Sequence, residues 1–200
     1  LYFLSDYKNS GLIFWYLEKE GRFSEPKARF YIAEIILALR HLHDNDIVYR
    51  DLGPGKILLD NYGHIVLSDF GLSVSKLDRA DDSYFDYLSP EIVLTDEKYI
   101  MTVDFWSLGV LPFDMGCGWS SSYSGSTEQM CKNIPFGKTR FHSDAWGSDG
   151  KDLIKRLLNR NQEHRPGAAG GSQQLMDHWF FSDIDWDALG RKVVTPPFTP

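Results

Sequence analysis

The sequence has few cysteines, no long apolar run and no cluster of basic residues. Cys117 and Cys131 are the only cysteines in the 200 residues, which argues against a disulfide framework and is typical of a reducing compartment, so we expect a cytoplasmic location. No run of roughly 18 apolar residues is present that could span a membrane. The formal net charge is −7, and no Lys/Arg-rich block could dock on nucleic acid or anionic lipid. Nucleic-acid-binding and membrane-spanning classes are therefore disfavoured.

The chain also lacks an initiator methionine and the basic start of a signal peptide. It begins Leu1-Tyr2-Phe3-Leu4, which is typical of the end of a strand, so we expect it to begin inside a domain. Core material is plentiful, because apolar residues make up 42% of the sequence and include 13 Phe, 10 Tyr and 6 Trp. Length and composition indicate one globular domain, or a large part of one, rather than a disordered chain.

The periodicity of apolar residues predicts a mainly helical domain with one small β region. Spacings of three and four from Tyr31 to Leu42 predict a long buried helix, which begins after an N-cap at Ser24 and ends near His43. The segment 103–115 is apolar on nearly every side, typical of a buried central helix. Shorter helices are expected near 12–17, 127–134, 150–159 and 172–179, strands at 47–49, 57–59 and 64–67, and an extended surface tail over 193–200.

Three short motifs follow one another in a specific order. They are Tyr49-Arg50-Asp51-Leu52, then Asp69-Phe70-Gly71 eighteen residues after Asp51, then Ser89-Pro90-Glu91. Each alone is a weak indication, because such triplets arise by chance. In this order and spacing, with Asp104-Phe105-Trp106-Ser107-Leu108-Gly109 close behind, they resemble the catalytic loop, the metal-binding triplet and the end of the activation segment of eukaryotic Ser/Thr protein kinases.

The resemblance extends over essentially the whole chain. Tyr49 stands where most kinases have His, which is similar to the AGC group, and the segments 157–161 and 180–186 resemble fungal kinases of the protein kinase B and SGK-like branch. It implies an α+β, protein-kinase-like fold. Residues 1–190 would form the hinge and a mainly helical C-terminal lobe with a small β hairpin, the N-terminal lobe being absent, and 191–200 would begin the AGC-type C-terminal tail.

The resemblance also implies a site for ATP, Mg²⁺ and a protein Ser/Thr substrate. Asp51 matches the catalytic carboxylate that accepts the proton of the substrate hydroxyl, and Asp69 matches the carboxylate that holds Mg²⁺ against the phosphates. Leu58 matches the apolar floor under adenine. Asp6 and Lys8 lie in the segment that offers backbone groups to the edge of the adenine ring.

Four further residues match family positions that maintain the fold. Glu91 matches a carboxylate that pairs with a later arginine, here Arg165. Asp104 matches a carboxylate that accepts hydrogen bonds from the catalytic-loop backbone, and Arg50 matches the arginine that meets an activation-segment phosphate in active members. We expect structural roles for all four.

The catalytic loop departs from the kinase pattern. It reads Asp51-Leu52-Gly53-Pro54-Gly55-Lys56 where the family has Asp-Leu-Lys-Pro-Glu-Asn. Gly53 replaces the Lys that contacts the γ-phosphate, Gly55 a Glu that reads substrate arginines, and Lys56 the Asn that binds a second Mg²⁺. An ammonium carries only donors and repels a metal ion, so we expect impaired phosphoryl transfer. The alternative is that Lys56 places one positive charge near the phosphates in place of that ion.

Two other departures favour impairment. The activation segment, residues 83–91, is shorter than in active relatives and lacks the Thr that supports the catalytic Asp, and no Gly-rich loop followed by a strand Lys occurs in the sequence. Three interpretations stay open: a kinase with impaired catalysis, a pseudokinase lobe that acts as a scaffold for protein partners, and a remnant without function.

Overall fold

The computed structural model describes four stretches of the chain, residues 10–71, 88–94, 101–117 and 146–200. Every structural statement below refers to these residues. Several predictions lie outside the described residues: those for Asp6, Lys8, Ser83 and the helix near 127–134.

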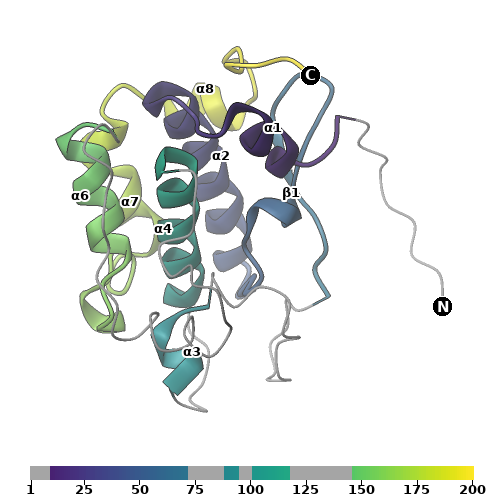
Figure 1. The fold of residues 1–200 in the computed structure, drawn as a ribbon. Helices are drawn as coiled ribbons and strands as arrows, with labels where there is room; N and C mark the ends of the chain where they lie inside the picture. Colours follow the sequence, from purple (N-terminus) through teal and green to yellow (C-terminus); the bar gives the residue numbers. More distant parts are fainter. Residues whose placement is uncertain (1–9, 72–87, 95–100, 118–145) are drawn as a thin grey trace.

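Two long helices, α2 (Glu25–His43) and α4 (Thr102–Cys117), lie side by side at the centre of the fold (Figure 1). Tyr31, Ile35 and Leu39 of α2 are fully buried, so the stripe predicted from the spacing is confirmed. Every residue of α4 from Thr102 to Gly116 is buried, as predicted for a helix that is apolar on nearly every side. These two helices form the frame on which the other elements pack.

Ser24 precedes α2 in an extended conformation, but it does not act as the predicted side-chain cap. Its hydroxyl makes no capping hydrogen bond, whereas its carbonyl accepts the N–H of Ala28 at 2.9 Å. The position of the helix start was therefore predicted correctly, and the means of capping was wrong.

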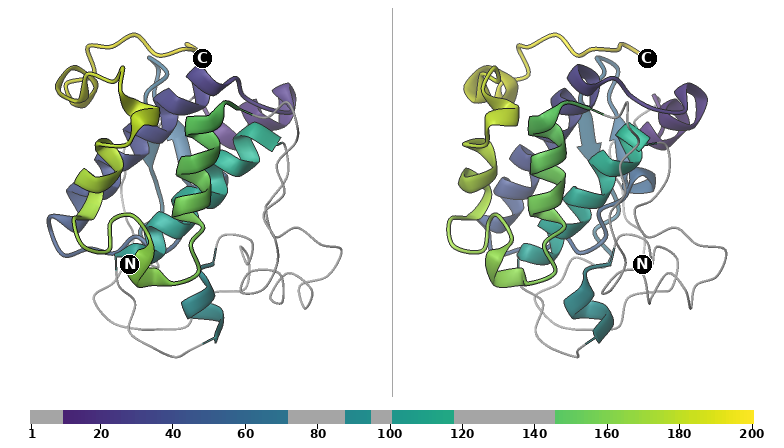
Figure 2. Two further views of the ribbon diagram at one scale, coloured as in Figure 1. Left: turned by 90° about the vertical axis from the view of Figure 1, so that its left-hand side faces the viewer. Right: turned by 60° about the vertical axis from the view of Figure 1, so that its left-hand side comes forward.

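The shorter helices surround this pair. In Figure 2, α6 (Ser148–Leu157) runs alongside α4, and α7 (Gly171–Met176) runs alongside α2. The approach of α6 to α4 depends on Gly109, because a Cβ there would lie 2.7 Å from the Cβ of Leu157. The remaining helices are α1 (Ile13–Glu20), α3 (Pro90–Leu94), α8 (Trp186–Gly190) and the short 3-10 turns Pro54–Lys56, Gln162–His164 and Trp179–Phe181.

One antiparallel hairpin makes up the described β structure. Its strands are β1 (Ile57–Leu59) and β2 (Ile65–Leu67), and their paired residues are Ile57 with Leu67, Leu58 with Val66 and Leu59 with Ile65. The Asp60 carboxylate accepts the backbone N–H groups of Tyr62 and His64, both at 3.0 Å, and so holds the connecting turn. The predicted hairpin is confirmed.

The predicted strand over 47–49 is wrong. This segment has no regular secondary structure and belongs to no ladder. The backbone N–H groups of Tyr49 and of the following Arg50 donate to the side chain of Asp104. They therefore do not pair with a neighbouring strand. A β-rich composition predicts extended backbone, and it does not reveal that a carboxylate takes the place of a partner strand.

The C-terminal residues 193–200 are not helical, as predicted, but they pack more closely than a surface tail. The Phe198 ring lies 4.7 Å from that of Tyr16, centroid to centroid, and Lys27 lies over its face. Gly63, at φ 93°, lies directly under the tail, because a Cβ there would be 1.9 Å from the Phe198 carbonyl oxygen. Among the described residues, no helix combines the length and the apolar character that crossing a membrane requires.

Candidate functional site

The loop that carries Asp51 is held by a buried carboxylate in the first turn of α4. Asp104 is fully buried and accepts the backbone N–H groups of Tyr49 at 2.8 Å and Arg50 at 2.7 Å. Its Oδ2 also lies 2.7 Å from Nε2 of His43 at the end of α2, which donates in this contact. A buried carboxylate is stable only with such partners. The two central helices therefore position the loop directly.

Two residues beside the predicted site have left-handed backbone conformations. Arg50, at φ 68°, directly precedes Asp51, and Asp69 itself has φ 57°. Such a conformation costs a non-glycine residue about 1–3 kcal/mol and persists only where the surroundings impose it. Around Arg50 the imposing contact is the bond from its N–H to Asp104. Strain of this kind gathers at functional sites, which supports assigning the site here.

Lys56 joins the two predicted acidic residues. Its Nζ lies 2.9 Å from Oδ2 of Asp51 and makes a close ion pair with Oδ2 of Asp69. The side chains of Asp51 and Lys56 are only 10% and 16% exposed, whereas that of Asp69 is 56% exposed. The structure thus brings Asp51 and Asp69 together, as expected of a shared site, but around an ammonium. The sequence indicated that Lys56 repels metal and did not predict this double contact.

The charges of this cluster are mutually stabilised. Burial alone would lower the pKa of the Lys56 ammonium, but the hydrogen bonds to Asp69 and Asp51 outweigh it and raise the pKa to about 12. The bond from Lys56, and a second from the Gly71 N–H, lower the pKa of the Asp69 carboxyl below its ordinary value. At neutral pH the Lys56–Asp69 contact is therefore a fully charged ion pair.

These residues do not fit Mg²⁺ in the way that the kinase family implies. Mg²⁺ needs oxygen ligands in near-octahedral geometry. Here the side chain between the carboxylates is a donor-only ammonium, and Asp69 already accepts bonds from Lys56 and Gly71. Within the described part of the chain, no group of three or more His, Cys, Asp or Glu side chains could hold a metal ion.

The predicted nucleotide-binding residues are only partly described. Leu58 is half-buried in β1, between the buried Ile57 and Leu59, so its side chain lies on the more open face of the strand. An isolated bridge connects it to Leu12. An apolar floor for a base requires such an open position, and the role of Leu58 stays a prediction.

The expected ion pair between Arg165 and Glu91 is present. The guanidinium donates to both carboxylate oxygens, at 2.7 and 2.9 Å, and its side chain is fully buried. Two further N–H groups reach the carbonyl oxygens of Thr102 at 2.7 Å and Asn159 at 3.1 Å, and the guanidinium lies over the ring of Trp106. This one side chain connects α3, the start of α4 and the segment after α6. Sequence reasoning found the pair but missed the carbonyl partners, since backbone acceptors have no residue signature.

A second buried pair was missed entirely. Nδ1 of His64 lies 2.5 Å from Oε1 of Glu34, whose Oε2 accepts the backbone N–H of Ile65 at 2.9 Å. Burial raises the pKa of the Glu34 carboxyl, although these two hydrogen bonds and the nearby Lys192 oppose the rise. The pair ties α2 to β2. A signal was available, because Glu34 interrupts an otherwise apolar stripe of α2.

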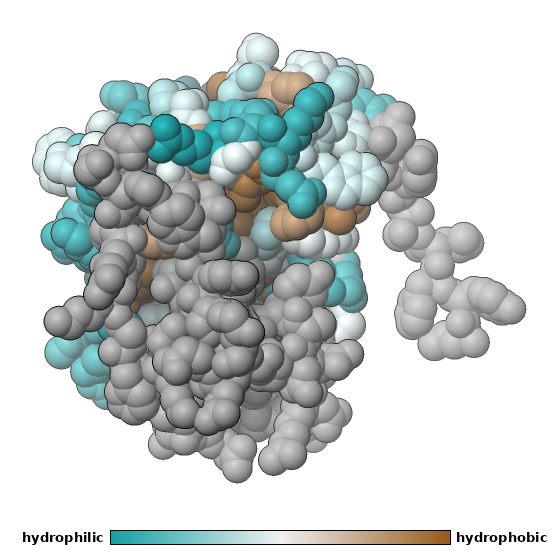
Figure 3. Space-filling view, in the orientation of Figure 1, coloured by the Kyte–Doolittle hydropathy of each residue, from teal (hydrophilic) through white to brown (hydrophobic). Residues whose placement is uncertain are grey.

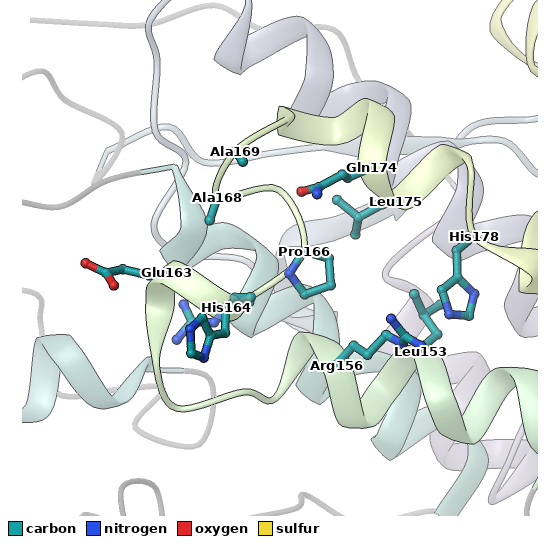
Figure 4. A pocket seen from close by; sticks show the side chains of 11 residues that line it. Leu153, Arg156, Glu163, His164, Pro166, Ala168, Ala169, Gln174, Leu175 and His178 are labelled. Atoms are coloured by element: carbon teal, nitrogen blue, oxygen red, sulfur yellow. The ribbon is translucent and has the colours of Figure 1, made fainter.

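A pocket of about 220 Å³ lies between α6 and α7, and none of the predicted catalytic or nucleotide-binding residues lines it (Figure 4). Arg156 and His178 border it, and both contact the same carboxylate, Asp152, at 2.7 and 3.1 Å. The positive charge of the basic side chains that border the pocket is therefore partly neutralised by Asp152. The Asp51–Lys56–Asp69 cluster remains the candidate site.

Comparisons with known proteins agree with this assignment of the fold. The family model described as "Protein kinase domain" matches residues 1–181. Over its full length the chain is 52% identical to serine/threonine-protein kinase sck1 of Schizosaccharomyces pombe and 51% identical to SCH9 of Saccharomyces cerevisiae, and it covers 30% and 25% of those proteins. It is 42% identical to human Sgk2 and covers 55% of it. The chain thus spans about a quarter to a third of these fungal relatives.

Proposed function

The chain belongs to the protein kinase family, and from that premise we propose that it is a protein-kinase-like lobe whose ATP-dependent phosphorylation of protein Ser/Thr is impaired. The observation that carries the proposal is the Lys56 ammonium between Asp51 and Asp69. The predicted role of Asp51 is to accept the proton of the substrate hydroxyl. Its Oδ2 already accepts from Lys56 at 2.9 Å, so a substrate hydroxyl has to compete for that oxygen.

Gly53 adds a second deficit. The Lys expected at this position contacts the γ-phosphate in active kinases, and a glycine has no charge to place there. The backbone does not require glycine, because φ −162° and ψ 167° are extended values open to any residue. The deficit is therefore one of side-chain chemistry, and a Lys at position 53 is compatible with the backbone conformation.

A protein-binding scaffold is the second candidate function. The contacts that hold the lobe together are retained, since Asp104 and the Arg165–Glu91 pair keep all the bonds described above. Two large apolar side chains of α1 also face solvent, Phe14 at 42% and Trp15 at 62% exposure. Figure 3 shows apolar surface among hydrophilic side chains on one face of the molecule. These features favour a folded lobe that acts through protein partners.

A chimera separates the two candidates. This chain replaces the matching 205-residue segment of the sck1 kinase, so that every other part of the enzyme comes from the relative. We expect phosphorylation of an Arg-rich peptide by Mg-ATP to fall to the level of an Asp51→Asn chimera. The Gly53→Lys/Lys56→Asn chimera should regain activity, because it restores the two loop side chains expected to act on the phosphates and the second Mg²⁺.

The controls decide what a loss of activity means. Circular dichroism and the melting temperature must show that all chimeras fold. Phosphorylation at the rate of unaltered sck1, abolished by Asp51→Asn, would show that catalysis is not impaired. A folded chimera that stays inactive after the double repair would assign the loss of activity to Gly55 or to residues outside the catalytic loop.

A further inference from the structure

We propose that the Lys56 ammonium is a built-in cation that takes the place of a divalent metal ion, so that Asp51 and Asp69 are held together without metal and Mg²⁺ is excluded from between them. The inference rests on the proposed function, because it concerns the same site. It goes further by stating what the substituted side chain does.

The position of Lys56 follows from the register of the hairpin. Ile57 pairs with Leu67, so Lys56 lies opposite Ser68, one residue beyond the strands. The Lys56 carbonyl accepts the Ser68 N–H at 2.9 Å and the Ser68 hydroxyl at 3.0 Å. Ser68 directly precedes Asp69, so the ladder itself brings Lys56 beside that carboxylate. The contact is a consequence of strand pairing rather than of a chance side-chain orientation.

The other side of the cluster is fixed as well. The Lys56 N–H donates to the Gly53 carbonyl at 3.0 Å, which closes the 3-10 turn after Asp51. The Tyr49 hydroxyl donates to the Ser68 carbonyl at 2.5 Å and thereby ties the catalytic loop to the segment before Asp69. Asp51, Lys56 and Asp69 therefore belong to three short segments whose backbones are bonded to one another.

The charges and acceptors indicate exclusion of a metal ion. Two carboxylates and one ammonium leave a net charge of −1 on the cluster. Oδ2 of Asp69 accepts from Lys56, and its Oδ1 accepts from Gly71 at 3.2 Å. A divalent ion entering between the carboxylates would face the ammonium at close range and would have to displace it. Three of the four carboxylate oxygens that it could bind, Oδ2 of Asp51 and both oxygens of Asp69, already accept from the protein.

Mn²⁺ binding tests the proposal directly. The full 200-residue chain is titrated with Mn²⁺, and the free ion is followed by electron paramagnetic resonance. We expect no binding at the Asp51–Asp69 site of the unaltered chain. Lys56→Asn should bind Mn²⁺ at least roughly tenfold more tightly, because it removes a neighbouring positive charge and adds an amide oxygen. Adding Asp69→Asn to that variant should abolish the gain.

The matched control is Lys19→Asn, which makes the same charge change on the exposed side of α1 and should not alter Mn²⁺ binding. Tight binding by the unaltered chain that Asp69→Asn removes would overturn the proposal, and this holds even if Lys56→Asn fails to fold. Equal affinity of a folded Lys56→Asn and the unaltered chain would also overturn it. An active chimera together with Mn²⁺ exclusion would refute the impairment alone and leave the built-in cation in place.

Discussion

Two charged clusters of this lobe use opposite arrangements. Arg165 is fully buried and pairs one-to-one with Glu91, and two carbonyl oxygens accept two further N–H groups. In the other cluster, two carboxylates share Lys56, and the side chain of Asp69 is 56% exposed. The first arrangement pairs a fully buried guanidinium with one carboxylate and suits a contact that holds the fold together. The second leaves an excess acidic charge near solvent, which is the charge expected of a site that attracts cations.

The comparison predicts the largest loss of stability when the buried Arg165–Glu91 pair is broken. Glu91→Ala leaves the Arg165 guanidinium buried without its counter-charge, which should lower the free energy of unfolding by about 3–5 kcal/mol. Urea denaturation measures it. Asp152→Ala is the control, because it removes a half-exposed carboxylate that contacts Arg156 and His178 near the surface, and it should cost about 1 kcal/mol. Equal losses of unfolding free energy in Glu91→Ala and Asp152→Ala would contradict the distinction between a buried and an exposed ion pair.

Asp104 should come next. Asp104→Asn keeps the shape but loses the charge that accepts from Tyr49, Arg50 and His43. We expect a loss of about 2–3 kcal/mol in the free energy of unfolding, because a buried donor is left without its acceptor. Chemical denaturation gives the loss, and amide hydrogen exchange at residues 49 and 50 should accelerate. Unchanged exchange there would show that the loop does not depend on this carboxylate.

The Lys56 cluster should contribute less to stability. Lys56→Met keeps the apolar stem and removes the ammonium. We expect a loss of about 1–2 kcal/mol, since Asp69 is largely solvated but Asp51, at 10% exposure, loses its partner. The melting temperature measures it against Glu91→Ala. A loss as large as that of Glu91→Ala would mean that the Lys56 cluster stabilises the fold as strongly as the Arg165–Glu91 pair does.

The smallest effect is the pH dependence of that contribution. The pKa of Lys56 is raised from 10.5 to about 12 in the folded chain, so its stabilisation is complete below pH 10.5 and is lost as the pH rises through 12. The pKa of Asp69 is lowered, so its contribution is present above its ordinary pKa of about 3.9 and is lost as the pH falls through the folded value. The difference in unfolding free energy between the unaltered chain and Lys56→Met should therefore be flat from about pH 5 to 9. A slope within that window would contradict the assigned directions.

The elements that followed from the sequence are those whose cause is local. The apolar spacing of α2 and the apolar residues on nearly every side of α4 each predict a helix from local sequence. One failure has a non-local cause. The segment 47–49 is not a strand because Asp104, more than fifty residues away, accepts the N–H of Tyr49. Composition cannot specify such partners.

The sequence by itself determined the family, through the order of its motifs, and it determined which residue types stand at the site, including the substitution of Lys56. Only the tertiary structure decided that Lys56 contacts both Asp51 and Asp69, because that contact depends on the register of β1 against β2 and on a turn held by Gly53. It also decided that backbone carbonyls satisfy Arg165 and that Glu34 meets His64. The charge of a side chain and the spacing of apolar residues can be read directly from the sequence. The hydrogen-bond partner of a buried polar group is determined only when distant segments pack together.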